Sequence, residues 1–336
     1  MTFSSNLSDM GRRFLNLVSK SIARGQEIDR KAEPLGIFFI LIKNIYASLV
    51  NQPSKKVDFN RFIDVNSLQF SGDHSNANIE VDILFVATGK DFPILKFSIK
   101  GAIQSLSNYS VENLVVIVPS TQVQTCRKIV KEIDLRIEVI SEDEIVDFEL
   151  RQRLKKIFGP RYGWVLQQVL KLVFVSKSRT SGVLVVDADT VLISPRDWID
   201  SEGNQILTPT WEYHLPYYEK LRDLDICDIN PTYTFVAHHM LMQPSIVREI
   251  LSKLEWDDVI SIIDYLEKNQ TSNSNSEFSI DYELYAQFLI RFYPEKVKLL
   301  KWSNSFQKGF SNETIDQIIN VNKGKFASLS FHTYES

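Results

Sequence analysis

The 336-residue sequence has few cysteines, no long apolar run and no excess of positive charge. Its two cysteines, Cys126 and Cys227, lie far apart and outside any Cys-x-x-Cys pattern, which argues against a disulfide scaffold or a cysteine zinc site and fits a reducing compartment. The strongest apolar run covers residues 37–42 and is much shorter than the roughly 18–20 residues of a membrane span. A formal net charge of −4 argues against general binding to nucleic acid.

Residues 1–56 differ from this average, because they hold nine Lys and Arg against four Asp and Glu. We expect helices over residues 8–24 and 35–50, which either pack on the main domain or rest on an anionic membrane surface. Residues 1–14 lack the apolar core of a secretory signal, so we expect a cytoplasmic protein, with peripheral contact at the inner face of the membrane as the further option. The first of these helices has apolar residues at helical spacing: Phe14, Leu15, Val18 and Ile22.

The pattern changes after residue 79, where apolar strands begin to alternate with amphipathic helices. This alternation predicts an α/β domain with a mainly parallel sheet flanked by helices, over residues 80–336. Residues 1–79 would form an N-terminal helical appendage and a connector. The predicted strands are 81–88, 114–119, 135–141 and 183–186, and the predicted helices are 91–106, 121–133 and 163–176.

The stretch VLVVDADTV places two acids at the end of a buried strand. Asp187 and Asp189 repel each other and lose hydration there, so we expect a compensating charge. In extended backbone, residues i and i+2 point the same way, so both carboxylates would face one hard cation, Mg²⁺ or Mn²⁺. Such an ion would bridge to a diphosphate and stabilise a departing nucleotide diphosphate.

The helix predicted just before this strand is apolar apart from one polar stripe. Gln167, Gln168 and Lys171 share a face, because Lys171 follows the two glutamines by four and three residues. The stripe predicts the lining of a cavity, with the lysine against a phosphate or a carboxylate. The alternative is a lysine that reaches solvent beside two surface glutamines.

Together these stretches resemble the glycosyltransferases of GT-A fold, in a little-characterised bacterial-type branch. The resemblance covers about residues 80–336 and rests on VDILFVATGKDFP, WVLQQVLKL, the DAD that closes VLVV, and IDYELYAQF. It implies a Rossmann-like fold and a metal-dependent transferase of hexosyl or related groups. The donor would be a nucleotide-diphosphate sugar, the acceptor a carbohydrate or glycoconjugate hydroxyl, and the pathway surface polysaccharide or glycoconjugate synthesis.

The resemblance also implies roles for individual residues. The first strand and its loop would bind the donor nucleotide through Ala87, Thr88 and Lys90. The DAD residues Asp187, Ala188 and Asp189 would hold the metal and the diphosphate, with Gln167, Gln168 and Lys171 helping to position it. His332, by its position after SLSF, matches the further metal ligand of this fold.

The acceptor side is predicted from three more stretches. Asp281 and Glu283 are candidates for the base that takes the acceptor proton, Glu283 first, although acids in a first helical turn also complement the helix dipole. Trp211 lies in a segment over residues 208–221 that the prolines mark as a loop, and its aromatic rings would suit an acceptor sugar. His239 would meet the acceptor, since strand alternation turns only one of His238 and His239 inward. The Asn/Ser-rich residues 269–276 would form a lid.

Two other functions fit parts of the sequence. A phosphatase of the haloacid-dehalogenase type would use Asp187 as its nucleophile, because DADTV fits its strand-end pattern, although that pattern belongs on the first strand of its domain. A non-catalytic sugar-nucleotide-binding module would keep the same site as a scaffold.

Overall fold

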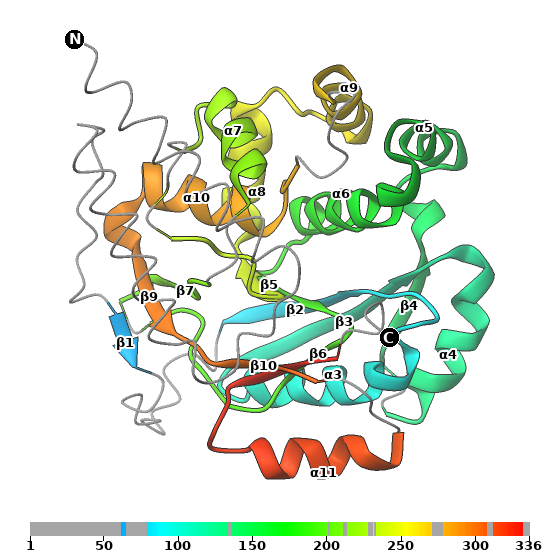
Figure 1. The fold of residues 1–336 in the computed structure, drawn as a ribbon, viewed down its shortest axis with the longest axis vertical. Helices are drawn as coiled ribbons and strands as arrows, with labels where there is room; N and C mark the ends of the chain where they lie inside the picture. Colours follow the sequence, from blue (N-terminus) through cyan, green and yellow to red (C-terminus); the bar gives the residue numbers. More distant parts are fainter. Residues whose placement is uncertain are drawn as a thin grey trace, which may run out of the picture.

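In a computed structural model, the main domain has three layers, with helices on both faces of a central sheet (Figure 1). No helix in the part of the chain described is long and apolar enough to cross a membrane. The described residues are 62–64, 79–133, 136–200, 202–210, 214–227, 231, 233–270, 278–307 and 312–331. The helices predicted near the N-terminus therefore lie outside them.

The central sheet confirms the prediction of a mainly parallel α/β fold. Its strand order is β4-β3-β2-β5-β8, and only β8 runs antiparallel, against β5. Strands β2 and β5 are buried on both faces over most of their length, as continuous apolar runs predict. The strands of the sheet are β2 (Glu80–Val86), β3 (Ser110–Val118), β4 (Glu138–Ser141), β5 (Gly182–Asp187) and β8 (His239–Met242).

The side chains of β2 alternate between two cores. Leu84 packs in one core and its neighbours Ile83 and Phe85 pack in the other. The first core is closed by α5 (Phe148–Phe158), α6 (Tyr162–Lys177), α8 (Pro244–Lys253), α9 (Val259–Asn269) and α10 (Tyr282–Phe292). The second is closed by α3 (Phe92–Ser105) and α4 (Val123–Lys131).

Two small sheets flank the central one. In the first, the order is β1-β9-β7, all parallel, so residues of the predicted connector form a strand beside β9. In the second, the order is β10-β11-β6, and β6 runs antiparallel to β11. The strands are β1 (Phe62–Asp64), β9 (Val297–Lys301) and β7 (Gln205–Leu207), then β10 (Asn304–Phe306), β11 (Ser328–Ser330) and β6 (Thr190–Leu192).

Helix α3 holds the second small sheet against the central one. Gly101 faces the backbone of Leu192 so closely that a Cβ at this position would clash with the carbonyl oxygen. Ser98 donates from Oγ to the carbonyl oxygen of Ala188, at 3.0 Å. The start of β6 and the turn before it are thereby fixed to α3.

The segment predicted as a loop over residues 208–221 is in part a helix. Helix α7 (Leu215–Asp223) begins with Pro216 in its first turn, where a missing N–H costs nothing. Tyr218 is fully buried and Leu221 nearly so, which explains why this segment folds onto the core. The loop prediction for these residues was therefore wrong. One more helix, α11 (Asn312–Asn322), packs against α3.

Candidate functional site

Two segments meet at one edge of the central sheet. One is the acidic turn, residues Asp187 to Asp189 at the end of β5, and the other is the loop of Ala87 to Lys90 that follows β2. Strands β2 and β5 are neighbours and parallel, with Val86 opposite Asp187 in the register. The carboxyl ends of parallel strands form the crevice where open α/β sheets bind ligands. Ala87 is buried at this edge, whereas Thr88 and Lys90 are exposed. The exposed part of the loop is thus available to a ligand.

Asp91 shapes this loop rather than capping α3. Its Oδ2 accepts hydrogen bonds from the backbone N of Thr88 at 2.8 Å and from the Thr88 hydroxyl at 3.1 Å. Pro93 lies in the first turn of the helix, where proline is favoured. Burial raises the pKa of Asp91 above its usual value, and the nearby Asp189 carboxylate adds to the rise. The two carboxylates therefore repel each other across the site.

Asp187 is surrounded by hydrogen-bond donors. Its Oδ1 accepts from Nζ of Lys171 at 2.7 Å and from the hydroxyl of Tyr282 at 2.9 Å. Its Oδ2 lies 3.1 Å from Nδ1 of His238. Burial alone would raise the pKa of Asp187, but Lys171 and His238 outweigh it and hold the pKa well below the usual range. Asp187 is therefore ionised at neutral pH.

Lys171 is a buried cation between two acids. Its side chain is 2% exposed, and Nζ also lies 3.1 Å from Oδ2 of Asp281. The ammonium sits 4.4 Å from the centre of the Tyr282 ring. Burial lowers the pKa of Lys171, but Asp187 and Asp281 more than reverse this, so the pKa lies above its usual value. Lys171 is the charge that compensates Asp187.

The two aspartates of the DAD stretch are not related by strand alternation, which corrects the expectation of two carboxylates side by side on extended backbone. Strand β5 ends at Asp187, and Ala188 and Asp189 form the turn before β6. The carbonyl oxygen of Asp189 accepts from the backbone N of Phe331 at 2.8 Å. Asp189 is half-buried, and Ala188 is buried.

His238 joins the site through an unusual backbone conformation. Its φ of 62° lies in the left-handed region, and its carbonyl oxygen accepts from the backbone N of Asp187 at 2.8 Å. Strand β8 begins only at His239, so alternation does not separate the two histidines. Of the two histidines, His238 is the one whose ring contacts Asp187.

His239 lies in a second, buried cluster. Its side chain is 1% exposed, and its Nε2 is 3.4 Å from Nη1 of Arg196. The rings of Trp198 and Trp302 pack against it at 5.6 and 5.0 Å between centroids. Burial, and next the Arg196 charge, hold the pKa of His239 well below its usual value. The structure gives this imidazole a neutral, packed position instead of an open one.

The polar stripe on α6 divides between two roles. Gln168 is 1% exposed, and its Oε1 accepts a hydrogen bond from the backbone N of Ile280 at 2.8 Å. This bond connects α6 to the segment before α10. Gln167 is half-buried. Among the three stripe residues, Lys171 bonds to the acids of the site.

Glu283 is fully buried behind the site. Its Oε1 accepts from the hydroxyl of Tyr218 at 2.9 Å and from the backbone N of Phe235. Its Oε2 accepts from Nε2 of Gln287 at 3.1 Å. These contacts join three segments of the core. Asp281, two residues earlier, does not cap α10 with its side chain but turns to Lys171.

No role was predicted for Tyr282 and Phe306, two residues that lie at the site. Tyr282 had a sequence signal, since it sits between the two acids of IDYEL. The Phe306 ring lies 6.2 Å from the His238 ring, and its signal was a single aromatic residue in the polar stretch SNSFQK. Trp211, His332 and most of the Asn/Ser-rich tract lie outside the described residues.

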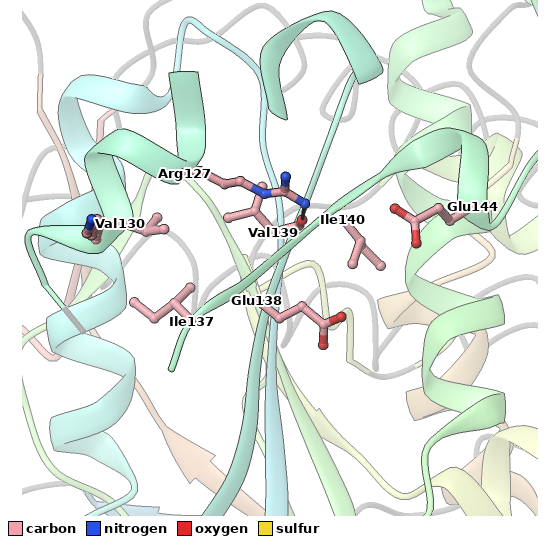
Figure 2. A pocket seen from close by; sticks show the side chains of 8 residues that line it. Arg127, Val130, Ile137, Glu138, Val139, Ile140 and Glu144 are labelled. Atoms are coloured by element: carbon pink, nitrogen blue, oxygen red, sulfur yellow. Dashed lines mark hydrogen bonds between the residues drawn. The ribbon is translucent and has the colours of Figure 1, made fainter. Parts of the chain in front are cut away.

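A separate groove lies at the far edge of the sheet. It has a volume of about 380 Å³ and lies between α4 and the edge strand β4 (Figure 2). Arg127 crosses it and donates from Nη2 to the carbonyl oxygen of Val139 at 3.1 Å. Strands β3 and β2 separate it from β5, so it is not part of the site at Asp187.

Comparison with solved structures finds similarity to glycosyltransferases. Mouse xyloside xylosyltransferase 1 is 10% identical, with 77% of this chain and 99% of that chain covered and a TM-score of 0.39. The galactosyltransferase LgtC with donor and acceptor sugar analogues is 14% identical, with 74% and 86% covered and a TM-score of 0.42. The bifunctional glycosyltransferase WbbM is 10% identical, with 75% and 45% covered and a TM-score of 0.41. Sequence identities and TM-scores this low do not establish a shared activity.

Sequence comparison gives a family but no activity. No curated protein matches this sequence. One family model, described as a family of unknown function (DUF6492), matches residues 94–293. This range holds α6, the DAD turn, both histidines and the acids of α10. It is more than half of the chain, and the protein belongs to this family.

Proposed function

We propose that the protein is a glycosyltransferase that moves a sugar from a nucleotide-diphosphate donor to an acceptor hydroxyl. The observation that carries the proposal is the meeting of the exposed Thr88–Lys90 loop with the Asp187–Asp189 turn at the carboxyl ends of neighbouring parallel strands. These two segments carry the resemblance to GT-A glycosyltransferases in the sequence. A role in surface polysaccharide or glycoconjugate synthesis follows from the same resemblance.

The donor would lie across the ends of β2 and β5. Ala87, Thr88 and Lys90 would bind the nucleotide, with the backbone of the loop held in shape by Asp91. The diphosphate would lie over the turn of Asp187, Ala188 and Asp189. Lys171 and the glutamines of α6 would act on it indirectly, because Lys171 and Gln168 are buried and hold Asp187 and the start of α10 in place.

The charges at this edge fit a bound Mg²⁺ or Mn²⁺. Acids outnumber lysines there, and the Asp189 carboxylate adds to the rise in the pKa of Asp91 that burial causes. No group of three or more His, Cys, Asp or Glu side chains is placed to hold a metal among the described residues. Magnesium commonly uses one or two carboxylates together with substrate phosphates and water. Asp189, with Asp187 beside it, would hold the ion, and His332 is the predicted further ligand.

A bound divalent ion would supply charge stabilisation for the departing nucleotide diphosphate. The chain's own contribution is to keep Asp187 ionised and fixed in direction. Three donors from three segments do this: Lys171 from α6, Tyr282 from α10 and His238 from the loop before β8. A carboxylate held in this way does not reorganise when charge develops nearby.

For the acceptor base we favour Asp281 over Glu283. Both oxygens of Glu283 accept hydrogen bonds within the core, and its side chain is fully buried. Asp281 shares the ammonium of Lys171 with Asp187. Trp211 is still proposed to contact the acceptor. His239 is 1% exposed, so we propose that it acts on the acceptor indirectly, by positioning neighbouring side chains.

The test is calorimetric binding of UDP, GDP and CDP, each with and without Mn²⁺, to wild type and Asp189→Ala. We expect one diphosphate to bind with Mn²⁺ and binding to be lost in the variant. Asp189 is the better position to replace, since removing the Asp187 carboxylate would also take away one of the two acids that pair with the buried Lys171. Absence of any nucleotide binding, with turnover of p-nitrophenyl phosphate lost in Asp187→Asn, would instead favour the phosphatase alternative. Absence of both would favour a non-catalytic module.

A further inference from the structure

Phe306 is an aromatic side chain that the fold exposes at the end of a strand. Six large apolar side chains are exposed in the described part of the chain, and Phe306, at 43% exposure, is the one that lies on a strand. The other five lie on helices: Ile103, Phe148, Ile260, Phe292 and Val321. Single exposed apolar side chains are ordinary on a protein surface, so it is the position of this ring, and not its exposure, that bears on the site.

The backbone around Phe306 is fixed relative to the DAD turn. Phe306 lies opposite Ser330 in the β10–β11 pair, and Ser330 lies opposite Thr190 in the β11–β6 pair. Thr190 follows Asp189 directly, and the next residue of β11's chain, Phe331, donates its N–H to the Asp189 carbonyl oxygen. Strand β10, which ends at Phe306, is therefore separated by β11 alone from β6, which begins directly after the acidic turn (Figure 1).

The side chain of Phe306 also reaches the site. Its ring meets the His238 ring edge to face, with 6.2 Å between centroids and an interplanar angle of 88°. His238 in turn contacts Asp187 through Nδ1. Backbone pairing and side-chain contact are independent observations, and both bring Phe306 to the Asp187 site.

The strand order gives the site a direction. The Thr88 loop follows β2, Asp187 ends β5, and His238 precedes β8, so these three lie in sequence along one edge of the sheet. Neighbouring strands are about 4.8 Å apart, so the edge from β2 to β8 spans about 10 Å. With the nucleotide at β2 and the diphosphate at β5, the group attached beyond the diphosphate lies on the β8 side.

We propose that Phe306 is the platform on which the sugar of the donor stacks. The inference rests on the proposed function and adds the place of the sugar to it. Sugar rings carry an apolar C–H face and a rim of hydroxyls. A phenyl ring offers the flat apolar surface, and the side-chain oxygens of Asp187 and Asp189 nearby offer hydrogen-bond acceptors. A nucleobase would stack equally well, but the strand order puts it at the opposite end of the site.

The test compares nucleotide binding with and without an attached sugar. The probes are UDP, GDP and CDP and, for the one that binds, its glucose, galactose and mannose conjugates, with Mn²⁺ present. The proteins are wild type, Phe306→Ala, Phe306→Trp and, as a matched control, Phe148→Ala, whose ring is 64% exposed on α5. Calorimetry gives the affinities, and saturation-transfer NMR shows which protons of the ligand contact the protein.

We expect Phe306→Ala to keep its affinity for the nucleoside diphosphate and to lose about tenfold in affinity for the sugar conjugate. Saturation of the sugar protons should fall while that of the base protons stays. Phe306→Trp and Phe148→Ala should behave as wild type. Thermal unfolding will show whether Phe306→Ala is folded, as the exposure of its ring leads us to expect.

Three results would overturn the inference. Equal losses for diphosphate and sugar conjugate in Phe306→Ala would place the base or the diphosphate on the ring. Unchanged sugar affinity would remove Phe306 from the donor site while leaving the proposed function in place. Wild type that binds neither diphosphate nor conjugate would overturn the proposed function, and the inference with it.

Discussion

The ammonium of Lys171 lies 2.7 Å from Oδ1 of Asp187 and 3.1 Å from Oδ2 of Asp281. One buried cation thus joins the middle of α6 to the end of β5 and the start of α10. Lys171 and Asp281 are buried and Asp187 is partly exposed. Because the shared lysine has little contact with water, the lysine and the two acids depend on one another. Four predictions concern these residues and their neighbours, and a fifth concerns the helix beneath the turn.

Lys171→Met should destabilise the fold strongly. The substitution leaves two carboxylates without their shared counter-ion, and breaking a buried ion pair by removing one partner costs about 3–5 kcal/mol. Urea unfolding of the variant and wild type measures this difference. The matched control is Lys298→Met, because Lys298 also bonds to two acids, Asp200 and Glu202, but is 34% exposed. There we expect a loss of about 1 kcal/mol or less. Equal losses in the two variants would contradict this account of Lys171.

The stabilisation from Asp187 should disappear in acid. Its pKa in the folded protein lies below the ordinary value of 3.8, so folding favours the ionised form. Such stabilisation is present above the unfolded-state pKa and is lost as the pH falls toward the folded-state pKa. The difference in unfolding free energy between wild type and Asp187→Asn should be constant near neutral pH and shrink below about pH 4. A difference that does not change with pH would show that Asp187 acts by packing alone.

Asp189→Ala and Asp187→Ala should separate binding from stability. Asp189 is half-buried, and the hydrogen bond from Phe331 goes to its backbone, which alanine keeps. We expect a stability loss of about 1 kcal/mol or less and at least about tenfold weaker binding of the nucleoside diphosphate. Asp187→Ala should lose about 3 kcal/mol because it removes one of the two acids that pair with the buried Lys171 and the acceptor of the Tyr282 hydroxyl. Calorimetric binding and urea unfolding on both variants decide the matter. A large stability loss in Asp189→Ala would make Asp189 structural.

Glu283→Gln should lower the stability of the fold more than it lowers the transfer activity. An amide nitrogen in place of Oε2 would face Nε2 of Gln287, which is held by the carbonyl oxygen of Tyr233 at 2.8 Å. Two donors then oppose each other, at a cost of about 1–3 kcal/mol. Transfer activity measured below the melting temperature should persist. Unchanged stability with abolished activity would instead identify Glu283 as the base that the sequence predicts.

Gly101→Ala should loosen the support of the acidic turn. The added methyl group would meet the backbone carbonyl of Leu192, which cannot move aside without displacing β6, and overpacking of this kind costs about 1–3 kcal/mol. The control is Gly163→Ala on α6, where a Cβ meets nothing within 4 Å and helix propensity predicts a gain of up to about 1 kcal/mol. Thermal unfolding compares the two. Similar shifts in both variants would contradict the close packing at Gly101.

Much of the central sheet could be predicted from the sequence, because its signal is local. Apolar runs such as residues 81–86 and 183–186 appear as buried strands, and their alternation with helices gives a parallel sheet. The polar stripe of α6 could be predicted from helical spacing in the same way. The predictions that failed applied the two-residue alternation of a strand to residues beyond the end of that strand. Asp189 and His238 each lie one or two residues outside a strand, in a turn and in a left-handed conformation, where period-two alternation no longer holds.

The partners of Asp187 could not be predicted, since they come from distant parts of the chain. Lys171, Tyr282 and His238 are separated from it by 16, 95 and 51 residues. Periodicity says which face of its own element a side chain occupies, but not which other segment packs there. The structural role of Glu283 has the same origin, because Tyr218 and Phe235 approach it from elsewhere in the fold.

The turn of Ala188 and Asp189 is also the junction between two sheets. Asp187 is the last residue of β5 in the central sheet, and Asp189 immediately precedes β6, which belongs to the small sheet with β10 and β11. Each carboxylate is therefore attached to the end of a different sheet. The separation of the two acids is set by how the two sheets pack, so any shift of the small sheet would change that separation and move Phe306 with it.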